Sequence, residues 1–239
     1  MSLSAARSIV RRLHRKAQEL AGVWPDPVRN PTASEFEVDL GTLSRFLLAK
    51  IVPVVGTLSY PLNELLLMTA ATCRLKPEVV FDWGTHIGTS ARVFYECRQT
   101  FKLGYDVHSI DLPPTASHAE HPGSKHGRLV QGLAGVHLHR GNGVEVALAL
   151  WQKLGCPKRP LFFVDGDHAY ESVRELNQIF SIVPDASALA HGTFFQSAES
   201  NYNVGPARAI DEIVAKFPAR FRVVKSGLGL PGMTLLAAI

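Results

Sequence analysis

The sequence predicts an α/β protein: a doubly wound, mostly parallel, seven-stranded sheet with an antiparallel C-terminal hairpin and an N-terminal helical extension. Three observations lead to this fold class. Short apolar runs alternate with helix-like segments from about residue 60 onward, which is typical of a parallel sheet covered by helices on both faces. Glycine and acidic residues gather just after these runs. The last two runs are joined by only six residues, 227–232.

Each element follows from a short apolar run or from helical periodicity between turn residues. The expected strands lie in the runs 78–83, 105–111, 135–141, 160–167, 191–197, 220–226 and 233–239. The expected helices are 61–75, 89–102, 124–133, 143–154, 169–182 and 204–216. Six residues are too few for a parallel crossover, so the last two strands must be antiparallel neighbours.

The chain before this alternation differs in character. Residues 1–58 are expected to form a helical extension and linker, followed by one domain over 59–239. Within the extension, a basic helix is expected at residues 1–20. A linker or surface loop is expected at residues 23–38, because this segment is rich in proline and polar residues. The basic helix has apolar residues at roughly helical spacing, so it packs on its own domain or lies on a membrane surface or a partner.

Composition narrows the class of protein. The 239 residues are 46% hydrophobic and 19% charged, as in ordinary globular domains and unlike disordered chains. No apolar run approaches the roughly 20 residues of a membrane-spanning helix, and the start lacks a secretory signal, so a cytoplasmic protein is expected. The three cysteines are scattered without paired spacing, which suits a reducing compartment.

The positive charge is confined to the start of the chain. Five basic residues precede the first acid, Glu19, so removing them from the net charge of +4 leaves −1 for the rest. A near-neutral body is unlike a surface that follows phosphates, so nucleic acid is not expected as a partner. Whether copies of the chain form a homo-oligomer stays open.

The first glycine-rich turn lies at 82-DWGTHIG-88, after the first strand, where open α/β sheets bind their ligands. A nicotinamide dinucleotide site would need a glycine where His86 stands. An acid followed by two glycines suits S-adenosylmethionine instead, because glycine lets the backbone approach the ligand and Asp82 can engage its cationic end directly or through water. A turn without any ligand is the alternative. The expected contacts are Asp82, Gly84, Thr85, His86, Gly88, Thr89 and Ser90.

The next two strand ends supply further candidates. Asp111 ends the second strand, and an acid at this distance from the glycines can accept hydrogen bonds from ribose hydroxyls. A solvated strand-end aspartate is the alternative. After the third strand, Asn142 and Gly143 lie where an adenine edge would be bound.

The fourth strand should deliver Asp165, Asp167 and His168 to the same edge, where burying ionisable groups without purpose would be costly. His168 is suited to take the proton of a hydroxyl. Asp165 would orient it, hold a water, bind a weak metal or contact the cofactor. Alternatively, His168 caps the following helix.

Four segments together resemble the class I S-adenosylmethionine-dependent methyltransferases, and among them the small O-methyltransferase-like family of the macrocin O-methyltransferase and cephalosporin hydroxylase type. They are 80-VFDWGTHIGTSA-91, 108-HSIDL-112, 162-FFVDGDHAYESVREL-176 and 226-SGLGLPG-232. The resemblance spans about residues 60–239. It implies a Rossmann-like fold and methyl transfer to a hydroxyl of a small molecule such as a sugar or natural product.

The resemblance also implies site residues. In metal-dependent members, the aspartate at Asp165 helps bind a divalent ion such as Mg²⁺ and the histidine at His168 is the general base. Further carboxylates follow the next strand, in a segment reading like His-Asp or Glu-Asp. In the expected counterpart, Gln196 and Ser197 replace acids and Glu199 is the nearest substitute.

No metal is therefore expected unless Asp165 and Glu199 hold it. The missing acids keep a second hypothesis open, a cofactor-binding protein without transferase activity, and an oxidoreductase is a third. Two more features bear on the site. Tyr60, Pro61 and Glu64 lie where related enzymes close over the cofactor. Residues 112–127 are expected to form a loop over the acceptor pocket.

Overall fold

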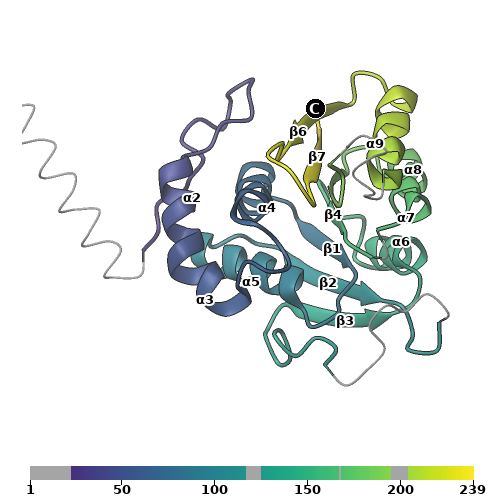
Figure 1. The fold of residues 1–239 in the computed structure, drawn as a ribbon, viewed down its shortest axis with the longest axis horizontal. Coiled ribbons are helices and arrows are strands. Elements are labelled where there is room, and N and C mark those ends of the chain that lie inside the picture. The colour runs from purple at the N-terminus through teal and green to yellow at the C-terminus, as the bar shows by residue number, and fades with distance from the viewer. Residues whose placement is uncertain (1–22, 117–124, 167, 195–203) are drawn as a thin grey trace, which may run out of the picture.

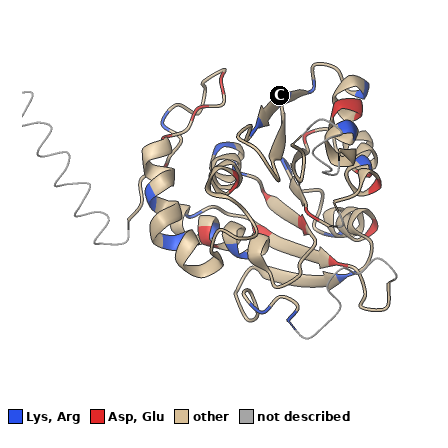
Figure 2. Cartoon of the chain, viewed as in Figure 1, with Lys and Arg blue, Asp and Glu red and all other residues tan. Residues whose placement is uncertain are grey.

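The computed structural model describes residues 23–116, 125–166, 168–194 and 204–239. The expected basic helix at 1–20 lies outside these residues. In the described part of the chain, no helix is long and apolar enough to cross a membrane. Figure 2 shows acidic and basic residues interspersed along the helices and loops, as expected for a near-neutral body.

A seven-stranded sheet forms the centre of the molecule, with strand order β3-β2-β1-β4-β5-β7-β6 (Figure 1). Strands β1 to β5 pair in parallel, and β7 runs antiparallel to both β5 and β6. The predicted fold class and the C-terminal hairpin are therefore confirmed. The strands are β1 (Val79–Trp83), β2 (Asp106–Asp111), β3 (Val136–Arg140), β4 (Leu161–Val164), β5 (Ser187–His191), β6 (Phe221–Lys225) and β7 (Met233–Ala238).

Helices cover both faces of the sheet, because successive strand side chains point to opposite sides. Val80 faces a core shared with α4 and α5, whereas Phe81 faces a core shared with α6, α8 and α9. The helices are α2 (Leu40–Phe46), the π-helix η1 (Leu47–Ile51), α3 (Val52–Val55), α4 (Leu62–Leu75), α5 (Thr89–Phe101), α6 (Gly143–Lys153), α7 (Tyr170–Arg174), α8 (Leu176–Ile182) and α9 (Gly205–Lys216).

The helices before the first strand pack directly on the sheet core. Phe46 and Ile51 are fully buried in the same cluster as Val80 and Phe163 of the central strands. The sequence predicted α4, at 61–75, but not α2, η1 or α3. A domain boundary between 58 and 59 stays a prediction.

The fifth strand differs from its prediction. It was expected at 191–197, but β5 is Ser187–His191 and ends where the expected strand begins. The strand lies between β4 and β7, and every one of its residues is buried. Small residues such as Ala188 and Ala190 suit a central strand covered on both faces, and this tertiary burial outweighs their weak strand preference.

The expected helix at 124–133 is also wrong over its described part. Residues 125–132 form turns, and Gly127 has a positive φ of 64°. Two backbone N–H groups that an α-helix would use internally are bound elsewhere. That of Gly127 donates to the His86 carbonyl at 2.8 Å, and that of Leu129 donates to the Ile87 carbonyl at 3.0 Å. The segment therefore folds onto the first glycine turn. The expected helix 169–182 is divided into α7 and α8 at Glu175.

Candidate active site

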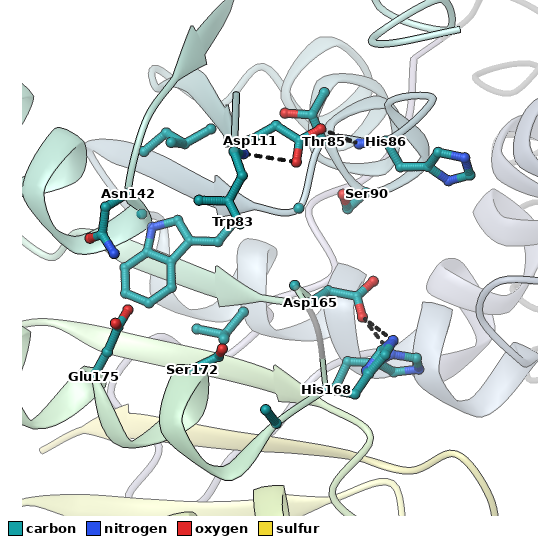
Figure 3. A pocket seen from close by; sticks show the side chains of 18 of the residues that line it. Trp83, Thr85, His86, Ser90, Asp111, Asn142, Asp165, His168, Ser172 and Glu175 are labelled. Carbon is teal, nitrogen blue, oxygen red and sulfur yellow. Dashed lines mark hydrogen bonds and ion pairs between the residues drawn. The ribbon is translucent and has the colours of Figure 1, made fainter. Parts of the chain in front are cut away.

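One cavity lies at the carboxyl ends of the parallel strands and has a volume of about 790 Å³ (Figure 3). The end of each of β1 to β5 contributes to its wall. Ten predicted site residues line it: Gly84, Thr85, His86, Thr89, Ser90, Asp111, Asn142, Gly143, Asp165 and His168. Candidates from four strand ends, separated in the sequence, thus meet around a single space.

In the first glycine turn, Gly84 lies against the backbone at the end of β4. Gly84 has a φ of 96°, and a Cβ there would lie 2.1 Å from the Asp165 carbonyl oxygen. The missing side chain therefore lets the ends of β1 and β4 approach each other, whereas the sequence analysis assigned it to ligand approach. Gly88 has a φ of 89° and faces Val130; it is not among the residues that line the cavity.

Asp82 lies beneath the cavity and does not line it. Its side chain is fully buried, and its Oδ2 accepts a hydrogen bond from the Ser109 hydroxyl at 2.5 Å. That hydroxyl lies 2.7 Å from the Thr85 hydroxyl, which borders the cavity. Burial raises the pKa of Asp82 to about 7, against the lowering effect of Ser109. The expected direct contact between Asp82 and a ligand is therefore corrected: the strand places this carboxyl in the core, where it supports the turn.

Asp111 lies at the cavity wall with both oxygens in use. Its Oδ2 accepts from the His86 backbone N–H at 3.2 Å, and its Oδ1 accepts from the Leu112 backbone N–H at 3.0 Å. Arg140 Nη1 lies 3.6 Å from Oδ2. The carboxylate is thus fixed at the end of β2 next to the glycine turn, with about a quarter of its side chain (27%) exposed.

Asn142 and Gly143 begin α6 and support a tryptophan. The Asn142 side-chain oxygen accepts from the backbone N–H groups of Val144 and Glu145, so it is the N-cap of the helix. A Cβ on Gly143 would lie 2.8 Å from the indole of Trp83, which lines the cavity between Asn142 and Glu175 (Figure 3). Trp83 was not among the predicted site residues, although an aromatic side chain inside the glycine motif is a signal that the sequence contains.

Asp165 lies at the centre of a buried network of ionisable groups. Its Oδ1 accepts a hydrogen bond from His191 Nδ1 at 2.7 Å, and its Oδ2 accepts one from the Tyr60 hydroxyl. On the other side of the imidazole, His191 Nε2 lies 3.0 Å from Glu64 Oε2. The second Glu64 oxygen accepts from the Gly232 backbone N–H at 2.7 Å. Glu64 is fully buried.

The two carboxylates decide the charge of His191. Burial alone would lower the pKa of this imidazole, but hydrogen bonds to Asp165 and Glu64 outweigh burial and raise it to about 9. Burial would likewise raise the pKa of Asp165, and the hydrogen bond and charge of His191 hold it below its usual value instead. Burial, followed by the charge of Asp165, raises the pKa of Tyr60. At neutral pH the network therefore contains an imidazolium between two carboxylates.

His168 lies at the edge of this network in an unusual backbone conformation. Its φ is 51°, in the left-handed region that non-glycine residues seldom adopt outside functional sites and turns. Its Nε2 is 3.6 Å from Asp165 Oδ1, and 39% of its side chain is exposed. Ala169, and not His168, is the N-cap residue of α7. The alternative role of His168 as a helix cap stays a prediction.

Because β5 ends earlier than predicted, different residues stand at the positions where metal ligands were expected. Since the strand ends at His191, the segment that should resemble His-Asp is His191-Gly192 and not 194–200. Gly192 then stands where a carboxylate was expected, and it has a φ of 69°. Gln196, Ser197, Glu199 and Asp167 lie outside the described residues. His191 was not among the predicted site residues, because the sequence pattern places this histidine at the start of a strand.

No protein-family model matches this chain, and no curated protein matches it. Solved structures do match. The SAH-bound Podospora anserina methyltransferase PaMTH1 is 16% identical, over 97% of this chain and 96% of that chain, with a TM-score of 0.50. The O-methyltransferase NovP is 12% identical, over 75% and 81%, with a TM-score of 0.52. CalS11, a TDP-rhamnose 3'-O-methyltransferase of calicheamicin biosynthesis, is 14% identical, over 83% and 92%, with a TM-score of 0.50.

These similarities establish the fold, which is that of the class I methyltransferases. At such low identity they do not extend to the activity. The narrower resemblance to macrocin O-methyltransferase and cephalosporin hydroxylase stays a prediction.

Proposed function

We propose that this protein transfers a methyl group from S-adenosylmethionine to a hydroxyl oxygen of a small molecule. The observation that carries the proposal is the cavity at the carboxyl edge of the sheet. It brings together a fixed carboxylate at β2, a tight turn at β1 and a histidine next to a buried carboxylate at β4. The fold that surrounds it is shared with a methyltransferase solved with SAH bound.

The cavity offers a complementary group for each part of the cofactor. Asp111 accepts from the ribose hydroxyls, as strand-end acids do in related sheets. Thr89 and Ser90 open helix α5, whose N-terminus favours the carboxylate of the methionine part. Trp83 and Asn142 lie where the adenine ring binds, and the Thr85 turn, held from below by Asp82 through Ser109, contacts the cationic end. Gly84, His86 and Gly143 also line the cavity.

For methyl transfer to a hydroxyl, the protein must position the acceptor oxygen and remove its proton. The sulfonium of the cofactor supplies an activated methyl group, so holding the acceptor oxygen in line with it provides much of the rate. A hydroxyl acceptor must also lose its proton, and His168, which lines the cavity next to Asp165 with 39% of its side chain exposed, accepts it. Asp165 orients His168, and it is held in place by Tyr60 and His191. A sugar hydroxyl is the acceptor we favour, since CalS11 acts on TDP-rhamnose within the same fold.

Binding and turnover test the proposal separately. Isothermal titration calorimetry should show S-adenosylhomocysteine binding to the full chain and no binding of NAD. Incubation with the methyl-labelled donor and a panel of nucleotide sugars and phenols should then give a labelled product. Absence of S-adenosylhomocysteine binding would refute the proposal. Binding without transfer to any acceptor would favour the cofactor-binding protein without transferase activity.

A further inference from the structure

Three potential metal ligands meet at one corner of the cavity. Asp165 follows β4, His168 lies in the next turn, and His191 ends β5. One ligand atom from each lies within 4.8 Å of the others, and no other group of this kind occurs among the residues that the structure describes. Asp165 Oδ1 is 2.7 Å from His191 Nδ1 and 3.6 Å from His168 Nε2. These distances are close to those between neighbouring ligands around one ion.

The residues behind these ligands are arranged as in a metal site. A histidine that binds a metal through one nitrogen almost always donates its other N–H to a carboxylate, carbonyl or water. His191 Nε2 lies 3.0 Å from the buried carboxylate of Glu64, within reach of such a partner, and Nδ1 is directed at Asp165. Glu64 is itself fixed by the Gly232 backbone N–H. The second oxygen of Asp165 is held by the Tyr60 hydroxyl. The outer partners therefore orient both ligands.

The remaining coordination positions face open space. All three side chains line the cavity, and the 39% exposure of His168 leaves an entry path from solvent. A site with three protein ligands on one side and open positions on the other can take water or a substrate oxygen. This is the arrangement of catalytic rather than structural metal sites.

The ligand types select the class of ion. Mg²⁺ prefers oxygen ligands and usually keeps several waters, whereas imidazole nitrogens suit zinc, iron, cobalt and nickel. We infer that Asp165, His168 and His191 form a two-histidine, one-carboxylate site for a divalent transition-metal ion. This ligand set differs from the Mg²⁺ and carboxylate set that the sequence resemblance implied, because Gly192 supplies no carboxylate.

Binding of the ion would release one proton from the pair formed by His191 and Asp165. In the ion-free protein a proton lies between His191 Nδ1 and Asp165 Oδ1. The ion forms bonds to these two atoms and to His168 Nε2, and the proton is released to water. An ion held by His168 also blocks that nitrogen as a proton acceptor. Ion-loaded protein and protein with His168 as a base are therefore two separate states.

Cobalt spectroscopy on the full chain tests this inference without reference to activity. After treatment with chelator and its removal, Co²⁺ should bind at one equivalent and give visible d–d absorption bands of mixed nitrogen and oxygen coordination. Zn²⁺ should abolish the bands by displacement, and excess Mg²⁺ should leave them unchanged. Calorimetry with Zn²⁺ should give the same stoichiometry.

Variants locate the site. His191→Ala and, at the more exposed position, His168→Ala should each abolish the bands, and Glu64→Gln should weaken affinity by about 10–100-fold. His137→Ala is the matched control, because His137 also lies against a carboxylate, at 2.9 Å from Asp106, but outside the cavity. Its bands should match the wild type. Circular dichroism checks that each variant is folded, and His168→Ala alone decides the matter if His191→Ala does not fold.

Two results would overturn the inference: no one-equivalent Co²⁺ binding in the wild type, or bands that persist in folded His168→Ala. The site rests on the three residues and not on the proposed methyl transfer. S-adenosylhomocysteine binding, measured in chelator-treated protein, reports on that function alone, so either idea can fail while the other stands.

Discussion

This protein contains two groups of histidines, and a buried member of each has its pKa shifted in the opposite direction. At the edge of the sheet, His108 Nδ1 lies 3.0 Å from His139 Nε2, and the ring of His137 stacks on that of His108. Burial, together with the nearby His137 and His139, lowers the pKa of His108 to about 4. In the cavity, two carboxylates raise the pKa of His191 to about 9.

Burial alone therefore does not decide the charge of a histidine here. Both His108 and His191 are buried, at 6% exposure each, and burial favours the neutral form of each. The partners make the difference: His108 faces other imidazoles, whereas His191 lies between Glu64 and Asp165. His108 is accordingly neutral and His191 is charged at neutral pH.

The largest expected effect is the loss of turnover on replacing His168, the more exposed of the two cavity histidines His168 and His191. His168→Ala should lower the methyl-transfer rate by about 10²–10⁴-fold, the usual contribution of a general base. Affinity for S-adenosylhomocysteine should not change, because the role that we propose for His168 is toward the acceptor and not the cofactor. Rate assays and calorimetry on the same preparation measure both. Loss of cofactor affinity as well would mean that His168 is structural.

The next largest effect is a loss of stability on replacing His191, the buried cavity histidine. His191→Ala leaves Glu64 and Asp165 buried without their shared cation, which should cost about 3–5 kcal/mol of the free energy of unfolding. His139→Ala, in the edge group, removes one hydrogen bond between neutral rings and should cost only about 0.5–1.5 kcal/mol. Urea unfolding of both variants measures the difference. Equal losses would contradict the contrast between the groups.

A smaller effect is expected for cofactor affinity. Asp111→Ala should weaken S-adenosylhomocysteine binding by about 1–3 kcal/mol, because charge-assisted hydrogen bonds to the ribose are lost. Asp106→Ala is the matched control. Asp106 begins the same strand and also pairs with an arginine, Arg98, at 3.1 Å, but it does not line the cavity. Calorimetry should show unchanged affinity for this variant; an unchanged Asp111→Ala would remove the ribose assignment.

The smallest effect is a difference in pH dependence, in chelator-treated protein. The folded-state pKa of His191 is raised from 6.5 to about 9, so its stabilising contribution is complete below pH 6.5 and is lost as the pH rises through about 9. That of His108 is lowered from 6.5 to about 4, so its contribution is present above pH 6.5 and is lost as the pH falls through about 4.

His108→Gln separates the two contributions. Urea unfolding across this pH range should show that the variant loses less stability on the acid side than the wild type and the same amount on the alkaline side. The raised pKa of Asp82 adds an equal slope to both proteins and cancels in the difference. An unchanged acid side would show that His108 is not neutral in the folded state.

Local information in the sequence determined most of the architecture. Apolar runs, helical periodicity and the six-residue link before β7 predict the class, the strand count and the hairpin, because each depends on neighbours along the chain. The edge of the sheet that holds the cavity followed from the same pattern. So did ten of the residues that line it, including Asp111 and His168, since the ends of parallel strands lie at one edge.

Only the tertiary structure decided how the charges in the cavity are paired. Glu64, Asp165 and His191 come from α4, the end of β4 and the end of β5, and nothing in the local sequence predicts that one imidazole lies between two carboxylates. The position of β5 itself depended on burial between β4 and β7, which outweighed local strand preference. Likewise Asp82, predicted to meet the ligand, is placed beneath the turn. Which side chains share a low-dielectric space, and hence their charges, is a property of packing, because it depends on distances between residues far apart in the chain.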